Sequence, residues 1–89
     1  MVSTQINNSF NDLINLLFAE SKVNVQASQF LSYVKEKQVS TQSQSASQIK
    51  ESIRGINRYY DEFEFTAANA KKIKNSIDSL YDQASRLAE

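Results

Sequence analysis

Apolar residues recur at intervals of three and four along the second half of the chain. Such spacing places them on one face of an α-helix, because the helix repeats every 3.6 residues. The run predicts one long helix over about residues 46–88. Ser45 with Gln48 has the capping-box spacing that marks a helix start, and Thr41 with Gln44 offers the same spacing one turn earlier. The helix is expected to start between Ser43 and Ser45. The stripe consists of Ala46, Ile49, Ile53, Ile56, Tyr60, Phe63, Ala67, Ala70, Ile73, Ile77, Leu80, Ala84 and Leu87.

The first half of the chain carries a similar but less regular stripe, which predicts a helix over about residues 4–37. Between Glu20 and Gln26 the pattern weakens, because two valines alternate there with polar residues. The helix is expected either to continue through this interval or to break into two. No Gly or Pro enforces a stop, which favours a continuous or kinked helix. The stripe consists of Ile6, Phe10, Leu13, Leu17, Ala27, Leu31 and Val34, flanked by Ile14, Phe18 and Val25.

The interval Gln38–Ser45 is uncharged and rich in Ser and Gln. Its hydroxyl groups compete for backbone hydrogen bonds and favour a connector over a helix. A short connector makes two helices antiparallel neighbours. The sequence therefore predicts an all-α fold, with residues 1–89 forming a single domain, an antiparallel hairpin of two long helices.

The amino-acid composition limits the fold classes and the kinds of chemical site that the chain can form. The 89 residues include one Gly and no Pro, Cys, His or Trp. A β-sandwich or a βαβ fold needs frequent turns built from Gly, Pro, Asn or Asp, so both are excluded. Without His or Cys there is no imidazole base, thiol nucleophile or zinc site of the usual type. We expect no cofactor.

A two-helix hairpin leaves part of such a wide apolar stripe exposed. A compact globule of this mass exposes only about 5,300 Å² of surface. A hairpin of two helices alone cannot bury enough surface to become that compact. We therefore expect the hairpin to complete a bundle with another chain, either a different helical protein, which is favoured, or a second copy. The candidate partner-binding residues are Phe10, Leu17, Ile53, Ile56, Tyr59, Tyr60, Phe63, Phe65, Ile73 and Ile77.

Charge gives no reason to expect a nucleic-acid partner. Ten basic and ten acidic residues balance to a net charge of zero. The one dense basic cluster, Lys71–Lys74, lacks the interleaved aromatic residues that stack on bases. On a helix, i,i+4 spacing pairs opposite charges. It predicts three such pairs, Arg58–Glu62, Lys74–Asp78 and Asp82–Arg86.

The sequence shows no secretory signal, because no Lys or Arg precedes Lys22 and the apolar run Leu16–Ala19 is too short for one. It also contains no stretch long enough to insert into a membrane. We expect a cytoplasmic protein, or one that is exported without a cleavable signal peptide.

Catalytic and metal-binding motifs are weak. Ser32 with Lys35 and Ser47 with Lys50 match the S-x-x-K pattern, but a chain this rich in Ser and Lys matches it by chance. The acidic run of residues 61–64 lacks the Gly of a calcium loop and is better interpreted as a solvated helix face. The sequence thus predicts a protein that is not an enzyme.

Gly55 falls inside the second predicted helix, where Gly costs about 1 kcal/mol relative to Ala. It is expected either to let a neighbouring backbone approach closely or to act as a hinge. The densest aromatic segment, Tyr59–Phe65, follows one turn later. Large aromatic side chains dominate many helix-groove contacts, so this segment serves either as core or as a partner-binding hot spot.

In size, composition and expected architecture the chain resembles the small α-helical proteins of type VII secretion in Gram-positive bacteria. These include the W-x-G superfamily and the small helical partners of LXG toxins. The superfamily carries a Y-x-x-x-[DE] export signal, and Tyr60 with Glu64 fits that spacing. The chain has no Trp and hence no W-x-G turn in its connector.

This resemblance implies a targeting chaperone that binds the helical region of an LXG toxin and promotes its export. The alternative is a self-assembling structural protein, such as a homodimeric four-helix bundle or a secretion-needle-like subunit.

Overall fold

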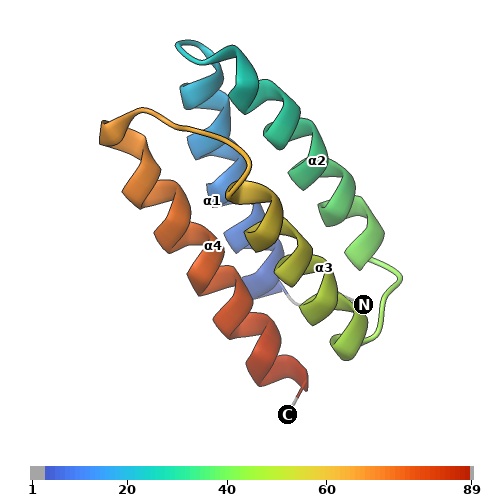
Figure 1. The fold of residues 1–89 in the computed structure, drawn as a ribbon. Coiled ribbons are helices and arrows are strands. Elements are labelled where there is room, and N and C mark those ends of the chain that lie inside the picture. Colours follow the sequence, from blue (N-terminus) through green and yellow to red (C-terminus); the bar gives the residue numbers. More distant parts are fainter. Residues whose placement is uncertain (1–3, 89) are drawn as a thin grey trace.

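The computed structural model describes residues 4–88, and these form four α-helices joined by short connections (Figure 1). This confirms the all-α class. The two expected long helices are each divided in two, so the predicted hairpin of two long helices was wrong. The helices are α1 (Thr4–Ser21), α2 (Val25–Thr41), α3 (Ala46–Tyr60) and α4 (Ala67–Ala88).

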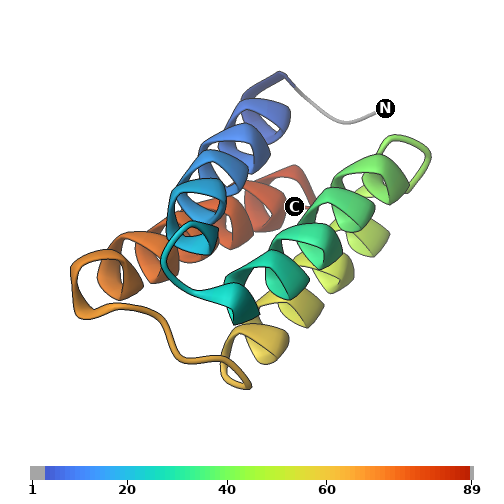
Figure 2. The ribbon, with the colours of Figure 1, turned by 90° about the horizontal axis from the view of Figure 1, so that it is seen from above.

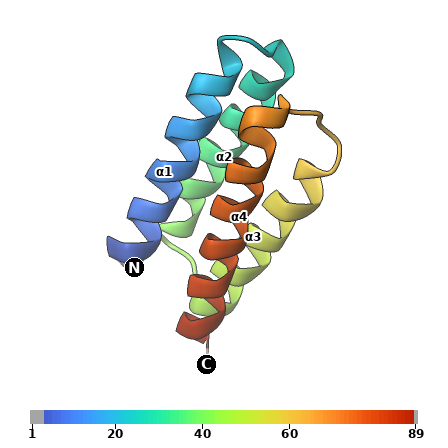
Figure 3. The same ribbon diagram turned by 90° about the vertical axis from the view of Figure 1, so that its left-hand side faces the viewer.

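The four helices form an up-down-up-down bundle. Each helix packs against two neighbours, and α4 closes the ring by packing against α1. In Figure 3 the α1–α2 and α3–α4 connections lie together at the top, and the first turn of α1 and the last turn of α4 lie at the bottom. Figure 2, seen from above, shows the two upper connections side by side. We call this end, formed by residues 22–24 and 61–66, the loop end.

The first expected helix breaks at residues 22–24, the interval where the sequence left a break open. Asn24 has extended backbone angles, and its side-chain oxygen accepts a hydrogen bond from the backbone N–H of Gln26 at 3.1 Å. Asn24 is therefore the N-cap of α2. This local cap ends the expected helix over 4–37 without a Gly or a Pro.

The second expected helix breaks at residues 61–66, where the apolar stripe gave no sign of an interruption. Asp61, Glu62 and Glu64 follow α3, and negative charge is unfavourable at a helix C-terminus, where the helix dipole is also negative. The two aromatic residues of this segment, Phe63 and Phe65, have only moderate helix propensity. Folding back at this point also lets α4 cover the stripe of α3.

The middle connection is shorter than the expected range of residues 38–45, because α2 continues to Thr41. The hydroxyls of Ser40 and Thr41 donate to the backbone carbonyls of Glu36 and Gln38, which is compatible with the helix rather than competing with it. The capping box predicted at Ser45 is confirmed. Ser45 accepts from the backbone N–H of Gln48, whose side chain accepts from the N–H of Ser45.

The core contains the whole predicted stripe of the first half of the chain and seven residues of the second stripe. Of the other six, Ala67 and Leu87 are exposed and four are half-buried. All four helices contribute to the core, so the chain covers with its own helices the surface that a hairpin would leave exposed. The accessible surface is 5306 Å², close to the value of about 5,300 Å² expected for a compact monomer of this mass. The buried hydrophobic residues are Ile6, Phe10, Leu13, Leu17, Ala27, Phe30, Leu31, Val34, Ile49, Ile53, Ile56, Ile73, Ile77, Leu80 and Ala84.

Two of the three expected charge pairs form. Lys74 lies 3.6 Å from Asp78, and Arg86 lies 2.8 Å from Asp82. The third, between Arg58 and Glu62, is absent from the ion pairs of residues 4–88, because α3 ends before residue 62 and the helical spacing is lost.

Candidate protein-binding site

Six of the ten candidate partner-binding residues lie inside the bundle. Their side chains are fully buried against the other helices of the same chain and do not reach its surface. In this arrangement they hold the fold together. These six are Phe10, Leu17, Ile53, Ile56, Ile73 and Ile77.

The other four candidates, Tyr59, Tyr60, Phe63 and Phe65, gather around the buried ring of Phe30 on α2. Their ring centroids lie between 5.5 and 6.3 Å from that of Phe30, within the range of favourable aromatic contacts. All four are half-buried. The cluster joins α2 to the end of α3 and to the α3–α4 connection, so it fixes the position of that connection.

Gly55 lies in the uninterrupted middle of α3, opposite Tyr33 of α2. A Cβ atom at Gly55 would lie 3.1 Å from the Tyr33 hydroxyl oxygen. The group that approaches Gly55 is therefore a side chain, and not the backbone that one of the two sequence interpretations expected. The Tyr33 ring in turn contacts that of Tyr59 in a tilted arrangement, with 4.5 Å between the ring centroids.

Tyr60 and Glu64, the pair with the spacing of an export signal, do not share a helix. Tyr60 ends α3, and its hydroxyl donates a 3.2 Å hydrogen bond to the carbonyl of Ala70 on α4. Burial raises the pKa of Tyr60, and the charges of Asp61 and Asp78 add to this, so the hydroxyl keeps its proton. Glu64 lies in the connection with an exposed side chain. Whether the pair acts as a signal stays a prediction.

Glu20 is a fully buried charged residue that sequence reasoning missed. Its position on the stripe, three residues after Leu17, was the available signal. The carboxylate accepts hydrogen bonds from the backbone N–H and the hydroxyl of Thr66, both at 2.7 Å, and from the amide of Asn69 at 2.8 Å. The Asn24 amide adds a fourth, at 3.2 Å. We call these four residues the Glu20 cluster.

The Glu20 cluster joins both connections of the loop end. Asn24 caps α2 through its oxygen, and its amide also donates a 2.7 Å hydrogen bond to the carbonyl of Glu64. Glu20 sits at the N-terminus of α4, where a negative charge offsets the helix dipole. The two connections are thus held in one arrangement by hydrogen bonds whose polar groups are all satisfied.

The environment of Glu20 favours its charged form. Burial raises its pKa, but the hydrogen bonds from Asn69, Thr66 and Asn24 lower it by more, and the pKa falls from 4.5 to about 2. The side chain is therefore a carboxylate at neutral pH and acts only as an acceptor.

The loop end exposes large apolar side chains. Val23 and Val25 are 72% and 83% exposed, and Phe18, on the last turns of α1, is 55% exposed. Val23 and Val25 line a surface hollow of about 430 Å³ between the two connections, with Phe65 on its opposite wall. Among residues 4–87 the other exposed large hydrophobic side chains are Val39, at 72%, and Leu87, at 41%, and both lie toward the opposite end of the bundle.

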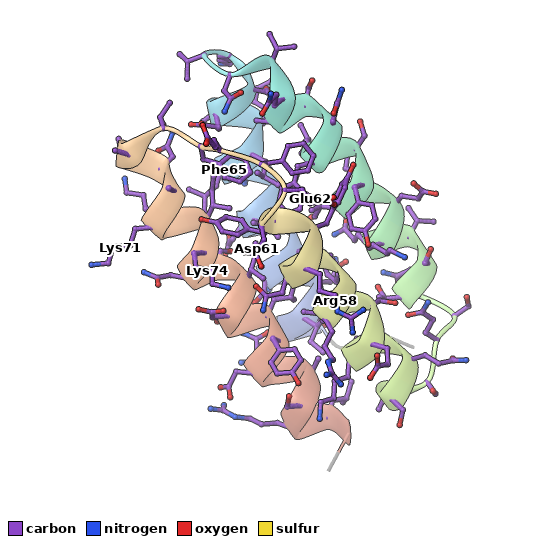
Figure 4. All side chains as sticks on the ribbon, viewed as in Figure 1. Arg58, Asp61, Glu62, Phe65, Lys71 and Lys74 are labelled. Carbon is purple, nitrogen blue, oxygen red and sulfur yellow. The ribbon has the colours of Figure 1, made fainter. Side chains whose placement is uncertain are left out.

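Glu64 lines this hollow, and Asp61 and Glu62 precede it in the same connection; all three are exposed. None of them forms an ion pair within the described part of the chain. In Figure 4, Lys71 projects from α4 away from α3, whereas Lys74 lies on the side of α4 that faces α3, where it contacts Asn57 and Asp78. The loop end thus combines negative charge without ion pairs and a hollow of mixed lining, in which Val23, Val25 and Phe65 are the apolar residues.

None of the helices formed by residues 4–88 combines the length and apolarity that a bilayer span needs. Over the same residues, no three acidic, His or Cys side chains come together as ligands of a metal ion would. No protein-family model, curated protein or solved structure matches the chain.

Proposed function

We propose that the protein is a non-enzymatic interaction module that binds another helical protein through its loop end. The observation that carries this proposal is the exposure of Phe18, Val23 and Val25 around one turn of the chain. Exposed apolar groups that gather at one place mark interaction sites more often than scattered ones do. Binding there removes these side chains from water without disturbing the core.

The rigidity of the loop end supports this proposal. Glu20 and Asn24 hold both connections by hydrogen bonds, and the aromatic cluster anchors the second connection from inside. A surface held in one conformation loses little conformational entropy on binding. The docking surface therefore lies on the ordered part of the fold.

The partner we propose is the helical region of an LXG toxin of type VII secretion. The resemblance of the chain to the small helical partners of such toxins supports this assignment, as does the bundle architecture, which offers helices and helix ends as contacts. The protein would act in the cytoplasm as a targeting chaperone and promote export of the toxin.

Co-expression with the helical N-terminal region of an LXG toxin from the same genome tests this function. We expect a stable heteromeric complex in size-exclusion chromatography with light scattering. Val23→Ser should weaken the complex, and Val39→Ser is the matched control, because both valines are 72% exposed but lie at opposite ends of the bundle. Two separate proteins after co-expression would overturn the proposed partner. A symmetric dimer of the chain alone would support the structural alternative.

A further inference from the structure

We propose that the hollow at the loop end receives a cationic amphipathic helix, whose apolar side chains enter the hollow and whose Lys or Arg side chains face Asp61, Glu62 and Glu64. This inference rests on the proposed function and specifies the chemistry of the partner.

The apolar part of the site comes from both connections. Val23 and Val25 form one wall and Phe65 forms the other, and the hollow of about 430 Å³ between them is open to solvent. The Phe65 ring is backed by Tyr60, with 5.2 Å between the centroids, and by Phe30. This wall therefore has a packed support, as apolar anchor sites at interfaces usually do.

The exposed charge of the α3–α4 connection is negative. Asp61, Glu62 and Glu64 are exposed and lack ion pairs among the described residues. The helix dipoles add little net charge, because the C-terminal ends of α1 and α3 and the N-terminal ends of α2 and α4 all lie at this end. Glu20, at the N-terminus of α4, contributes one further, buried negative charge.

The basic residue of the loop end, Lys22, already contacts an aromatic ring. The ammonium group of Lys22 lies 5.1 Å from the centre of the Phe18 ring, in a cation–π contact. It shows how a Lys side chain from a partner can lie on an exposed apolar group at this end. Complementary charge at the edge of an apolar patch raises association rates and selects the partner by sign.

Two synthetic peptides of equal length test the sign of the charge. Both form 18-residue amphipathic helices with Leu on the apolar face, and the polar face carries Lys in one and Glu in the other. We expect the Leu/Lys peptide to shift the backbone amide resonances of residues 22–26 and 62–66 of the full chain. A second surface hollow lies between α1 and α4, where Ser9 and Ser76 are among its lining residues. Binding of both peptides with equal affinity, or shifts centred on this second hollow, would overturn the inference.

Charge-reversal variants locate the contact. Glu62→Lys combined with Glu64→Lys should weaken binding of the Leu/Lys peptide by about tenfold. Asp12→Lys combined with Glu36→Lys is the matched control, since it makes the same change of charge at exposed acidic residues outside the loop end. We expect less than about a twofold effect from it. Equal losses in the two double variants would show a general charge effect and contradict the site. Glu62→Gln with Glu64→Gln replaces the first variant if that one fails to fold.

The outcome is separable from that of the proposed function. A toxin complex that forms but is insensitive to Val25→Ser and to reversal of Glu62 and Glu64 leaves the proposed function intact and removes this docking site. Binding of the Leu/Lys peptide at the hollow without any toxin complex keeps the docking chemistry and removes the proposed partner.

Discussion

Glu20 and Thr66 are 46 residues apart in the sequence, yet two 2.7 Å hydrogen bonds join them at the loop end. The carboxylate accepts from the backbone N–H through one oxygen and from the hydroxyl through the other. The contact ties the end of α1 to the start of α4, and it is the main polar link between the two connections.

Replacing the carboxylate by an amide should destabilise the fold. In Glu20→Gln one acceptor oxygen becomes an NH₂ group, which faces the donors of Thr66 or Asn69 and leaves at least one of them unpaired. We expect a loss of about 3 kcal/mol in the free energy of unfolding, measured by urea denaturation. Glu36→Gln, at an exposed position, is the control and should change stability by less than about 0.5 kcal/mol. Equal stabilities of the two variants would contradict the structural role of Glu20.

The same residue predicts a dependence of stability on pH. Because the pKa of Glu20 is about 2 in the folded chain and 4.5 as its ordinary value, the folded state binds this proton less tightly than the unfolded state. Its contribution is fully present above pH 4.5 and is lost as the pH falls toward 2. The loss is on the order of 3 kcal/mol. Urea denaturation at a series of pH values should show a shallower acid dependence in Glu20→Gln. Parallel curves for the two proteins would disprove the assignment.

Gly55 and Tyr33 should show coupled effects. Gly55→Ala gains helix propensity worth about 1 kcal/mol, but its Cβ would meet the Tyr33 hydroxyl at 3.1 Å. We expect only part of this gain with Tyr33 present and the full gain in the background of Tyr33→Phe. A double-mutant cycle by thermal or chemical denaturation measures the difference. Additive effects would mean that the hydroxyl does not restrict this position.

Core and surface positions should respond differently to truncation. Ile56→Ala removes a fully buried side chain and should cost about 2–5 kcal/mol, measured as the free energy of unfolding. Phe18→Ala removes a larger side chain that is mostly exposed, so we expect a change of less than about 1 kcal/mol. Comparable losses in the free energy of unfolding at the two positions would mean that Phe18 is buried, which contradicts this fold.

The chain should be a folded monomer at micromolar concentration in the absence of a partner. Its apolar stripes are already covered by its own four helices, and its accessible surface matches that of a compact monomer. Sedimentation velocity should give a single species of about 10 kDa, consistent with 89 residues. A stable dimer at this concentration would mean that a further surface is buried between copies.

The α-helical class of the fold, and the face of each helix that is buried in the core, could be predicted from the sequence. Both follow from the 3.6-residue period of the apolar positions. The break at Asn24 was visible as a weak interval, whereas the break after Tyr60 was not. There the stripe continues through Phe63 with helical spacing, and the turn depends on packing of that ring against Phe30, 5.5 Å away and on another helix. Such a contact between distant residues leaves no periodic signal.

The candidate site was predictable only in part. The aromatic residues Tyr59–Phe65 were recognised as a cluster with either a core or a binding role, and they line the core side of the loop end. Glu20 was missed because a single acidic residue on an apolar stripe is usually exposed, and its partners Thr66 and Asn69 become neighbours only after the chain has folded back.

Because the four helices pack in a closed ring, the same bundle could be built from a chain that starts at a different helix. Gln5 and Ile6 of α1 border the same surface hollow as Gln83 and Leu87 of α4, so the two ends of the described chain lie close together. A short linker between them, with the chain reopened between Thr41 and Ala46, would yield a circular permutant with the same four helices. The loop end would then sit on two unbroken hairpin connections, far from both new termini.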